Sequence, residues 1–317
     1  MVGKINSMTE SGLLAAVTVI MALIGVYVPL LGVAAVLLWP LPMIVLIVRH
    51  GLRWGIMAAV VAALLTAILV EPMIAIRLLV AFAPGGIALG LGYRKKWSGT
   101  NVFLAGLIVS MISKVLALGI AFWVTGIHPF AMQFDMMDQS FEKSVEMYQS
   151  MNMTPEQIEI ARENFKGNMS MVRQLLPLVV ILMGVLDTAV NFIVGGKILK
   201  RLGNEVAMFP VFTKWHLSSF FAYLYGFSII GMYWGTTRDI TLLYQISFNA
   251  NMLATMAGIL QGLVIYECLM EKYHVSKVIN MILMVMIFFS GVLLQLLAFV
   301  GIFDMVFDYR RRYNLNG

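Results

Sequence analysis

Leu175–Ile198 reads LLPLVVILMGVLDTAVNFIVGGKI, an apolar run that contains one acid, Asp187, and one amide, Asn191. A helix needs roughly 20 apolar residues to cross the hydrocarbon core of a bilayer. This run has that length, and such a long apolar stretch is typical of a segment surrounded by lipid. It therefore predicts a membrane-spanning α-helix.

The whole chain has the composition of a membrane protein. It is 61% hydrophobic and 12% charged, whereas soluble domains carry about 25% charged residues. Eight further runs reach spanning length: Ser11–Val28, Gly32–Val48, Trp54–Val70, Pro72–Leu91, Val102–Thr125, His216–Trp234, Leu242–Leu269 and Val278–Phe303. The second run holds Pro40 and Pro42, which favour a break in its helix. The fold class is therefore all-α, a polytopic transmembrane helical bundle of about nine spanning helices, or roughly eight to ten.

Short basic clusters alternate with the apolar runs, and the net charge is +6. This distribution follows the positive-inside rule and does not form the aromatic-studded patch of a nucleic-acid site. We therefore expect no nucleic-acid partner and a multi-pass protein of the bacterial cytoplasmic membrane with a cytoplasmic N-terminus. The residues on the predicted cytoplasmic side are Lys4, Arg49, Arg53, Arg94, Lys95, Lys96, Lys197, Lys200, Arg201, Lys214, Lys272 and Lys277.

The C-terminal tail conflicts with a count of nine. Nine crossings place Arg310, Arg311 and Arg312 on the outer side, where a basic cluster is disfavoured. Two explanations stay open: the last apolar run does not cross fully, or the count is wrong by one.

A polar segment at about 126–173 separates the fifth run from the sixth. Its apolar residues recur at helical spacing, and Thr154, Pro155 and Gln157 have the pattern of a capping box. We predict two short amphipathic helices that lie over the outer mouth of the bundle. They are either a lid or docking surface, or a packed spacer.

Sequence signatures of enzymes are absent. The chain has no H-E-x-x-H, G-x-S-x-G or Walker motif, and its one cysteine, Cys268, excludes a disulfide framework or a thiolate metal site. We therefore expect no enzyme activity, cofactor or metal. If transport uses ATP, another subunit has to hydrolyse it.

Three ionisable residues, Arg77, Lys114 and Asp187, interrupt apolar runs, where a charge is costly unless it is paired or hydrated. Lys114 and Asp187 both lie roughly 16–18 Å from the outer ends of their runs, at about 1.5 Å per residue. They can therefore form an ion pair, and Glu71 is a candidate partner for Arg77. Together with Asn191, these residues are the candidate intramembrane polar site. They either pin adjacent helices together or line a cavity for an anionic, zwitterionic or protonatable substrate.

Small residues mark candidate faces for helix packing or for a partner. Gly12 and Ala16 lie four residues apart in the first run, and Gly51 and Gly55 open the third. Side chains this small let two helix backbones approach closely.

Four stretches resemble the YybS-like family of bacterial multi-pass membrane proteins. They are MTESGLLAAVTVIMAL (Met8–Leu23), RHGLRWGIMAAVVAALL (Arg49–Leu65), RLGNEVAMFPVFTKWHL (Arg201–Leu217) and GIFDMVFDYRRR (Gly301–Arg312). The resemblance covers nearly the whole chain. It implies a multi-pass membrane fold and carries no catalytic motif.

Residues 1–200 are also similar to the six-helix substrate-binding S components of energy-coupling-factor transporters. The similarity rests on the small-residue first helix and on the glycines that open the third. It implies a six-helix bundle at 1–200, with additional membrane helices at 201–317 packed on the same bundle. In that family an Ala-x-x-x-Ala pattern on the first helix contacts the coupling subunit. Here Gly12 and Ala16 have that spacing but not both alanines.

Two functions follow as hypotheses. The first is capture or transport of a small molecule, with the lipid bilayer, a transport coupling subunit and an ATPase as partners. The alternative is a non-transporting scaffold or regulatory protein whose loop and basic turns dock other proteins. The sequence leaves the ligand and the oligomeric state open.

Overall fold

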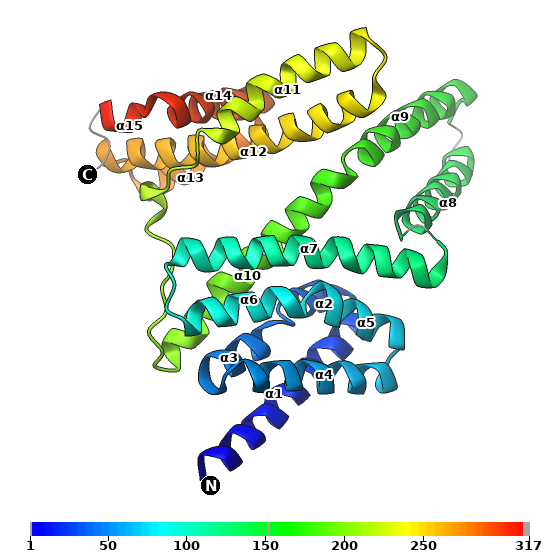
Figure 1. Ribbon diagram of the computed structural model, residues 1–317. Helices are drawn as coiled ribbons and strands as arrows, with labels where there is room; N and C mark the ends of the chain where they lie inside the picture. Colours follow the sequence, from blue (N-terminus) through cyan, green and yellow to red (C-terminus); the bar gives the residue numbers. More distant parts are fainter. Residues whose placement is uncertain (1, 128, 151–152, 313–317) are drawn as a thin grey trace. The chain divides into compact units, whose positions relative to one another are not determined.

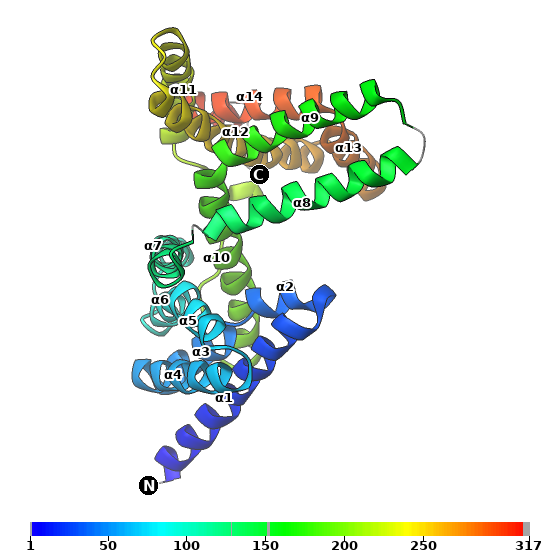
Figure 2. The same ribbon diagram turned by 90° about the vertical axis from the view of Figure 1, so that its right-hand side faces the viewer.

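The computed structural model describes residues 2–127, 129–150 and 153–312, and these contain helices and no strand. The side chains of Lys4 and Arg311, named above, lie outside the described part. The chain divides into two compact units (Figures 1 and 2). Unit 1 comprises Met1–Met169 and Val179–Met208, and unit 2 comprises Ser170–Leu178 and Phe209–Gly317. The predicted division into a six-helix bundle at 1–200 and additional membrane helices at 201–317 packed on it stays a prediction.

Unit 1 contains helices α1 to α8 and most of α9 and α10. They are α1 (Val2–Tyr27), α2 (Pro29–Leu37), α3 (Leu41–His50), α4 (Leu52–Leu69), α5 (Pro72–Ala81), α6 (Ala83–Arg94), α7 (Gly99–Thr125), α8 (Pro129–Ser150), α9 (Pro155–Gln174) and α10 (Leu176–Arg201). Two predicted spans are broken: α2 and α3 meet at Leu38–Pro40, and α5 and α6 meet at Phe82. Proline lacks an amide hydrogen and clashes with the preceding turn, which explains a break beside Pro40 and another beside Pro84.

The core of unit 1 is built around α3. Trp39, Met43 and Ile47 are fully buried or nearly so, in one cluster with alanines of α1, α4 and α6. Glycines let the neighbours come close, because a Cβ on Gly55 or Gly90 would overlap the Ile47 side chain. Small residues thus allow α4 and α6 to pack directly on α3.

Helices α8 and α9 form an antiparallel hairpin within the predicted loop (Figures 1 and 2). The rings of Phe141 and Phe165 stack with centroids 4.0 Å apart. Arg162 donates two hydrogen bonds to Glu142, at 2.6 and 2.7 Å. The predicted capping box is confirmed: the Thr154 amide donates to Gln157 Oε1, and the Gln157 amide donates to Thr154 Oγ1. Both helices are present, and both are longer than predicted.

Unit 2 contains the C-terminal helices η1 (Phe212–Lys214), α11 (Phe220–Thr237), α12 (Thr241–Lys272), α13 (Lys277–Phe289), α14 (Gly291–Phe307) and α15 (Tyr309–Arg312). Helices α11 and α12 form an antiparallel pair in which Gly231 packs on Ser247 and Gly235 packs on Tyr244. Helix α14 packs on α12 where Gly301 meets Gly258.

The described residues contain seven or eight candidate spans, where the sequence predicted about nine, or roughly eight to ten. In the described part of the chain, seven segments are long and apolar enough to cross a membrane: Ser7–Tyr27, Pro29–His50, Leu52–Leu69, Pro72–Arg94, Gly99–Thr125, Leu176–Arg201 and Thr241–Lys272. The pair α13 and α14 makes eight if it is one broken span, but it bends by 101°. Helix α11, which overlaps the predicted span His216–Trp234, is not among these segments.

Candidate functional site

Lys114 of α7 and Asp187 of α10 form an ion pair inside unit 1. Lys114 Nζ lies 2.8 Å from Asp187 Oδ2, and the two side chains are 11% and 4% exposed. Both helices are long enough to span a bilayer. The ion pair that the depths of Lys114 and Asp187 in the sequence made possible is therefore formed. Each charge offsets much of the other's cost of burial.

Two further side chains complete a polar cluster, which we define as Ser110, Lys114, Asp187 and Asn191. Ser110 Oγ donates to Asp187 Oδ2 at 2.9 Å and accepts from Lys114 Nζ at 2.7 Å. Asn191 Nδ2 donates to Asp187 Oδ1 at 2.9 Å. Ser110 precedes Lys114 by four residues, as Asp187 precedes Asn191, so each pair lies on one face of its helix.

The broken helices of unit 1 bring other groups to the polar cluster. Asn191 Nδ2 also donates, at 2.8 Å, to the carbonyl of Leu37, where α2 ends. The ring of Phe82, at the break between α5 and α6, lies 5.0 Å from Lys114 Nζ. A helix end leaves carbonyls without partners in their own helix, and the Asn191 amide satisfies one of them.

Some buried polar atoms of unit 1 have no hydrogen-bond partner. In the described part of the chain these are Trp39 Nε1, Thr188 Oγ1 and Asn191 Oδ1. Thr188 follows Asp187 directly, and Asn191 belongs to the polar cluster. Buried polar atoms are usually hydrogen-bonded, so an orphaned one calls for an explanation such as a water or a ligand. The polar cluster and the adjacent Thr188 therefore have spare capacity for hydrogen bonds.

Arg77 does not join the polar cluster. Helix α5 buries Ala75, Leu78 and Ala81, and their spacing of three places Arg77 on the exposed side of the helix. No ion pair between Arg77 and Glu71 is found in the described residues, so the candidate partnership is not formed. The predicted polar site is thus assembled from three of its four members.

The predicted small-residue faces differ in what covers them. A Cβ added to Gly12 would meet nothing within 4 Å, and Ala16 is exposed. By contrast, the Ile47 side chain occupies the space beside Gly55. Gly51 has φ +102°, which glycine adopts readily, and it lies against the guanidinium of Arg94. Within the described part of unit 1, the face at Gly12 and Ala16 is therefore open, and that at Gly51 and Gly55 is used internally.

A second buried ion pair, which the sequence analysis did not identify, lies in unit 2. Arg310 Nε lies 3.2 Å from Asp304 Oδ2, and the side chains are 4% and 0% exposed. The fully buried Gln261 of α12 donates to the same carboxylate oxygen at 2.7 Å. The sequence signal was Asp304, an acid that directly follows the last apolar run, Val278–Phe303, six residues before Arg310 of the basic tail.

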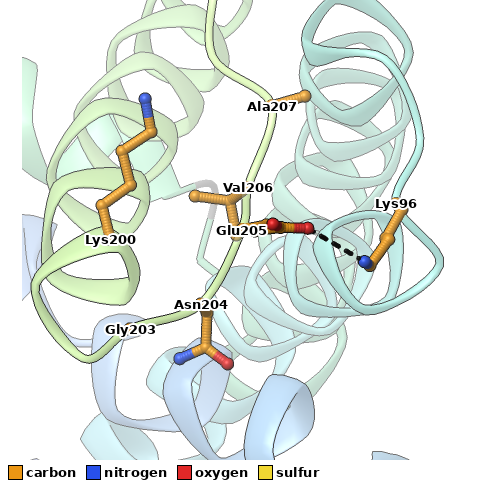
Figure 3. A pocket seen from close by; sticks show the side chains of 7 residues that line it. All are labelled: Lys96, Lys200, Gly203, Asn204, Glu205, Val206 and Ala207. Carbon is orange, nitrogen blue, oxygen red and sulfur yellow. Dashed lines mark hydrogen bonds and ion pairs between the residues drawn. The ribbon is translucent and has the colours of Figure 1, made fainter.

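A hollow of about 510 Å³ lies beside the C-terminal end of α10 (Figure 3). Its lining is Lys96, Lys200, Gly203, Asn204, Glu205, Val206 and Ala207. Lys96 pairs with Glu205 at 3.2 Å, and both side chains are mostly exposed. Figure 3 shows the Lys200 and Asn204 side chains pointing in different directions, so the lining does not converge on one ligand.

The comparisons with known proteins agree with a membrane fold. The family described as "Predicted membrane protein (DUF2232)" matches residues 16–305. The Bacillus subtilis (strain 168) protein described as "Uncharacterized protein YybS" is 24% identical over 316 residues, which is 97% of this chain and 98% of that protein. No solved structure matches. The resemblance to the YybS-like family is thus confirmed, and the chain belongs to the DUF2232 family of predicted membrane proteins.

Proposed function

We propose that this integral membrane protein binds a small polar molecule at the polar cluster and acts as an S-component-like capture or transport protein. The observation that supports this proposal is the buried Lys114–Asp187 pair with unpartnered polar atoms beside it. A purely structural ion pair needs no spare hydrogen-bond capacity, whereas a binding site needs donors and acceptors that the protein does not satisfy itself.

The chemistry of the polar cluster favours a zwitterionic or otherwise polar small molecule. Lys114 supplies a cation and Asp187 an anion, so a ligand with both charges can interact with each. Thr188 Oγ1 can donate or accept, and Asn191 Oδ1 can accept. Such a ligand replaces the missing hydrogen bonds and displaces no internal one at these two atoms.

The open face at Gly12 and Ala16 supports a partner that supplies the energy. We propose that a transport coupling subunit, itself bound to an ATPase, packs there through small residues, with the N-terminus on the cytoplasmic side of a bacterial cell membrane. The chain itself is proposed to be no enzyme, because its sequence carries none of the enzyme motifs sought above.

Native mass spectrometry of gently extracted protein tests the proposal, because it detects bound small molecules and subunits together. The decisive variant is Thr188→Val, which removes a hydroxyl that has no hydrogen-bond partner among the described residues. We expect the variant to fold normally and to bind the ligand about tenfold more weakly, since one hydrogen bond in a buried site contributes on the order of 1.5 kcal/mol. Thr66→Val is the matched control, because Thr66 Oγ1 is buried and bonds within its own helix.

Two results would contradict the proposal. One is protein that carries no small molecule after gentle extraction. The other is a Thr188→Val variant that binds the same molecule as tightly as the unaltered protein.

The alternative function, a non-transporting scaffold or regulator, has one observation in its favour. The α8–α9 hairpin is held by its own contacts, among them the hydrogen bonds from Arg162 to Glu142, which raise the pKa of Arg162. The hairpin nevertheless exposes the apolar side chains of Met132, Met136 and Ile160. Affinity capture with the unaltered protein separates the two functions. Capture of a coupling subunit rejects the scaffold, and repeated capture of one non-transport partner without a coupling subunit favours it.

A further inference from the structure

The second half of the last predicted span does not continue in the direction of the first. Helices α13 and α14 are joined at Ser290 and bend by 101°. At about 1.5 Å per residue, the 13 residues of α13 and the 17 of α14 measure roughly 20 and 25 Å. Each helix is shorter than the roughly 30 Å hydrocarbon core. Because the bend is slightly more than a right angle, α14 no longer advances in the direction of α13.

The beginning of this pair is attached near the C-terminal end of α12. Tyr266 Oη donates to the carbonyl of Asn280 at 3.0 Å and contacts its Oδ1 at 2.7 Å. Asn280 Nδ2 donates to Glu267 Oε2 at 2.9 Å. Asn280 lies in the first turn of α13, so α13 starts at the level of Tyr266 and Glu267.

The end of the pair is attached at the same level. Arg310 Nη1 donates to the carbonyl of Thr213 at 3.1 Å. The thiol of Cys268 contacts this same carbonyl at 3.5 Å. Arg310 therefore lies beside Cys268 of α12, one residue beyond Glu267, after α14 has crossed the middle of α12 at Gly258 and Gly262.

We infer that α13 and α14 form a re-entrant hairpin, which enters the membrane and returns to the surface from which it came. The start of α13 and the segment that follows the end of α14 are both held near residues 266–268 of α12. Helix α12 is itself long and apolar enough to span the membrane. The loop that follows α12 and the C-terminal tail then lie on one side of the membrane. The tip at Ser290 lies within the bilayer.

The tip has the properties that such a position requires. Backbone groups in hydrocarbon need hydrogen-bond partners. The Ser290 amide donates to the Met286 carbonyl at 3.0 Å, and Ser290 Oγ accepts from the Leu293 amide at 3.4 Å. The neighbouring Phe289 is 89% exposed within the chain, and a tip within the bilayer surrounds this apolar ring with lipid instead of water.

The hairpin also removes the conflict over charge. A returning chain places Arg310, Arg311 and Arg312 on the side of Lys272 and Lys277, as the positive-inside rule favours. No crossing after α12 is required; for this shared side to be the cytoplasmic one, α11 has to cross the membrane before α12 does. This inference concerns unit 2 alone and does not depend on ligand binding in unit 1.

Labelling of single cysteines tests the hairpin in the full chain. The background variant is Cys268→Ala, because Cys268 is the only cysteine. Tyr273→Cys marks the loop after α12, Arg238→Cys marks the opposite end of α12, and Arg312→Cys marks the tail. Sealed vesicles of both orientations are treated with a membrane-impermeant maleimide, and a permeant one gives the total.

We expect Arg312→Cys and Tyr273→Cys to react from the same side and Arg238→Cys from the other. Phe289→Cys, at the tip, should react with the impermeant reagent from neither side. A tail that reacts from the side of Arg238 would show that α13 and α14 cross as one broken span. Reaction of Phe289→Cys from the side of Arg238 would also overturn the hairpin. So would reaction of Arg238→Cys and Tyr273→Cys from the same side, because α12 would then not cross the membrane.

Discussion

At the scale of single residues, this protein buries opposite charges in pairs. Lys114 pairs with Asp187 in unit 1, and Arg310 pairs with Asp304 in unit 2. Removing one member leaves the other buried without a counter-charge, which costs about 3–5 kcal/mol, whereas replacing both by apolar residues is often neutral. Each pair therefore makes a distinct prediction.

For the first pair, we expect Asp187→Leu alone to destabilise the protein by about 3–5 kcal/mol. The double variant Lys114→Met with Asp187→Leu should regain most of that loss, because no buried charge remains. Thermal unfolding in detergent measures both. A double variant as unstable as the single one would indicate that the hydrogen bonds of Ser110 and Asn191, and not the charges, hold these helices together.

For the second pair, Arg310→Met should reduce stability by about 3–5 kcal/mol, since it leaves the Asp304 carboxylate buried and unbalanced. The matched control is Arg312→Met, which removes an exposed arginine two residues away. The same unfolding measurement applies. Equal effects of the two substitutions would contradict a specific role for Arg310.

At the scale of helices, close approach depends on particular glycines. Helix α14 contacts α12 where Gly301 lies against the Gly258 carbonyl, while Gly291 of the same helix has open space where a side chain would be. A glycine is thus required at one position of α14 and merely tolerated at the other.

We expect Gly301→Ala to push α12 and α14 apart and to destabilise the protein by about 1–3 kcal/mol, the usual cost of overpacking. Gly291→Ala should be neutral or slightly stabilising, because alanine favours the helix and meets no atom. Thermal unfolding of the two variants side by side is the measurement. A Gly301→Ala variant as stable as the unaltered protein would rule out the close contact.

Much at the scale of helices could be predicted from sequence. Apolar runs located the main spans because their length has to match the thickness of the bilayer. The capping box at Thr154 and Gln157 was readable because its residues are adjacent in the chain. The bend within Val278–Phe303 could not be predicted from sequence, because a straight span and a bent pair of helices have the same apolar composition.

At the scale of the whole molecule, the family and the helices together identify an integral membrane protein. We expect the protein to stay in the membrane fraction after washing with alkaline carbonate and to require detergent for extraction. Its apolar surfaces, exposed within the chain, include Leu30, Ile68 and Phe289, and water would not tolerate them in such number. Recovery of a detergent-free soluble monomer would contradict the membrane assignment.

The sequence by itself determined the membrane class, the approximate spans, the family and the depth at which Lys114 and Asp187 could meet. These features depend on run length and on position along one helix, which are local properties of the chain. Only the tertiary structure decided that Arg77 stays apart, that Arg310 returns to Asp304, and that Gly55 is filled while Gly12 is open. The physical reason is that helical periodicity shows which face a residue occupies, whereas the group that faces it belongs to another part of the chain.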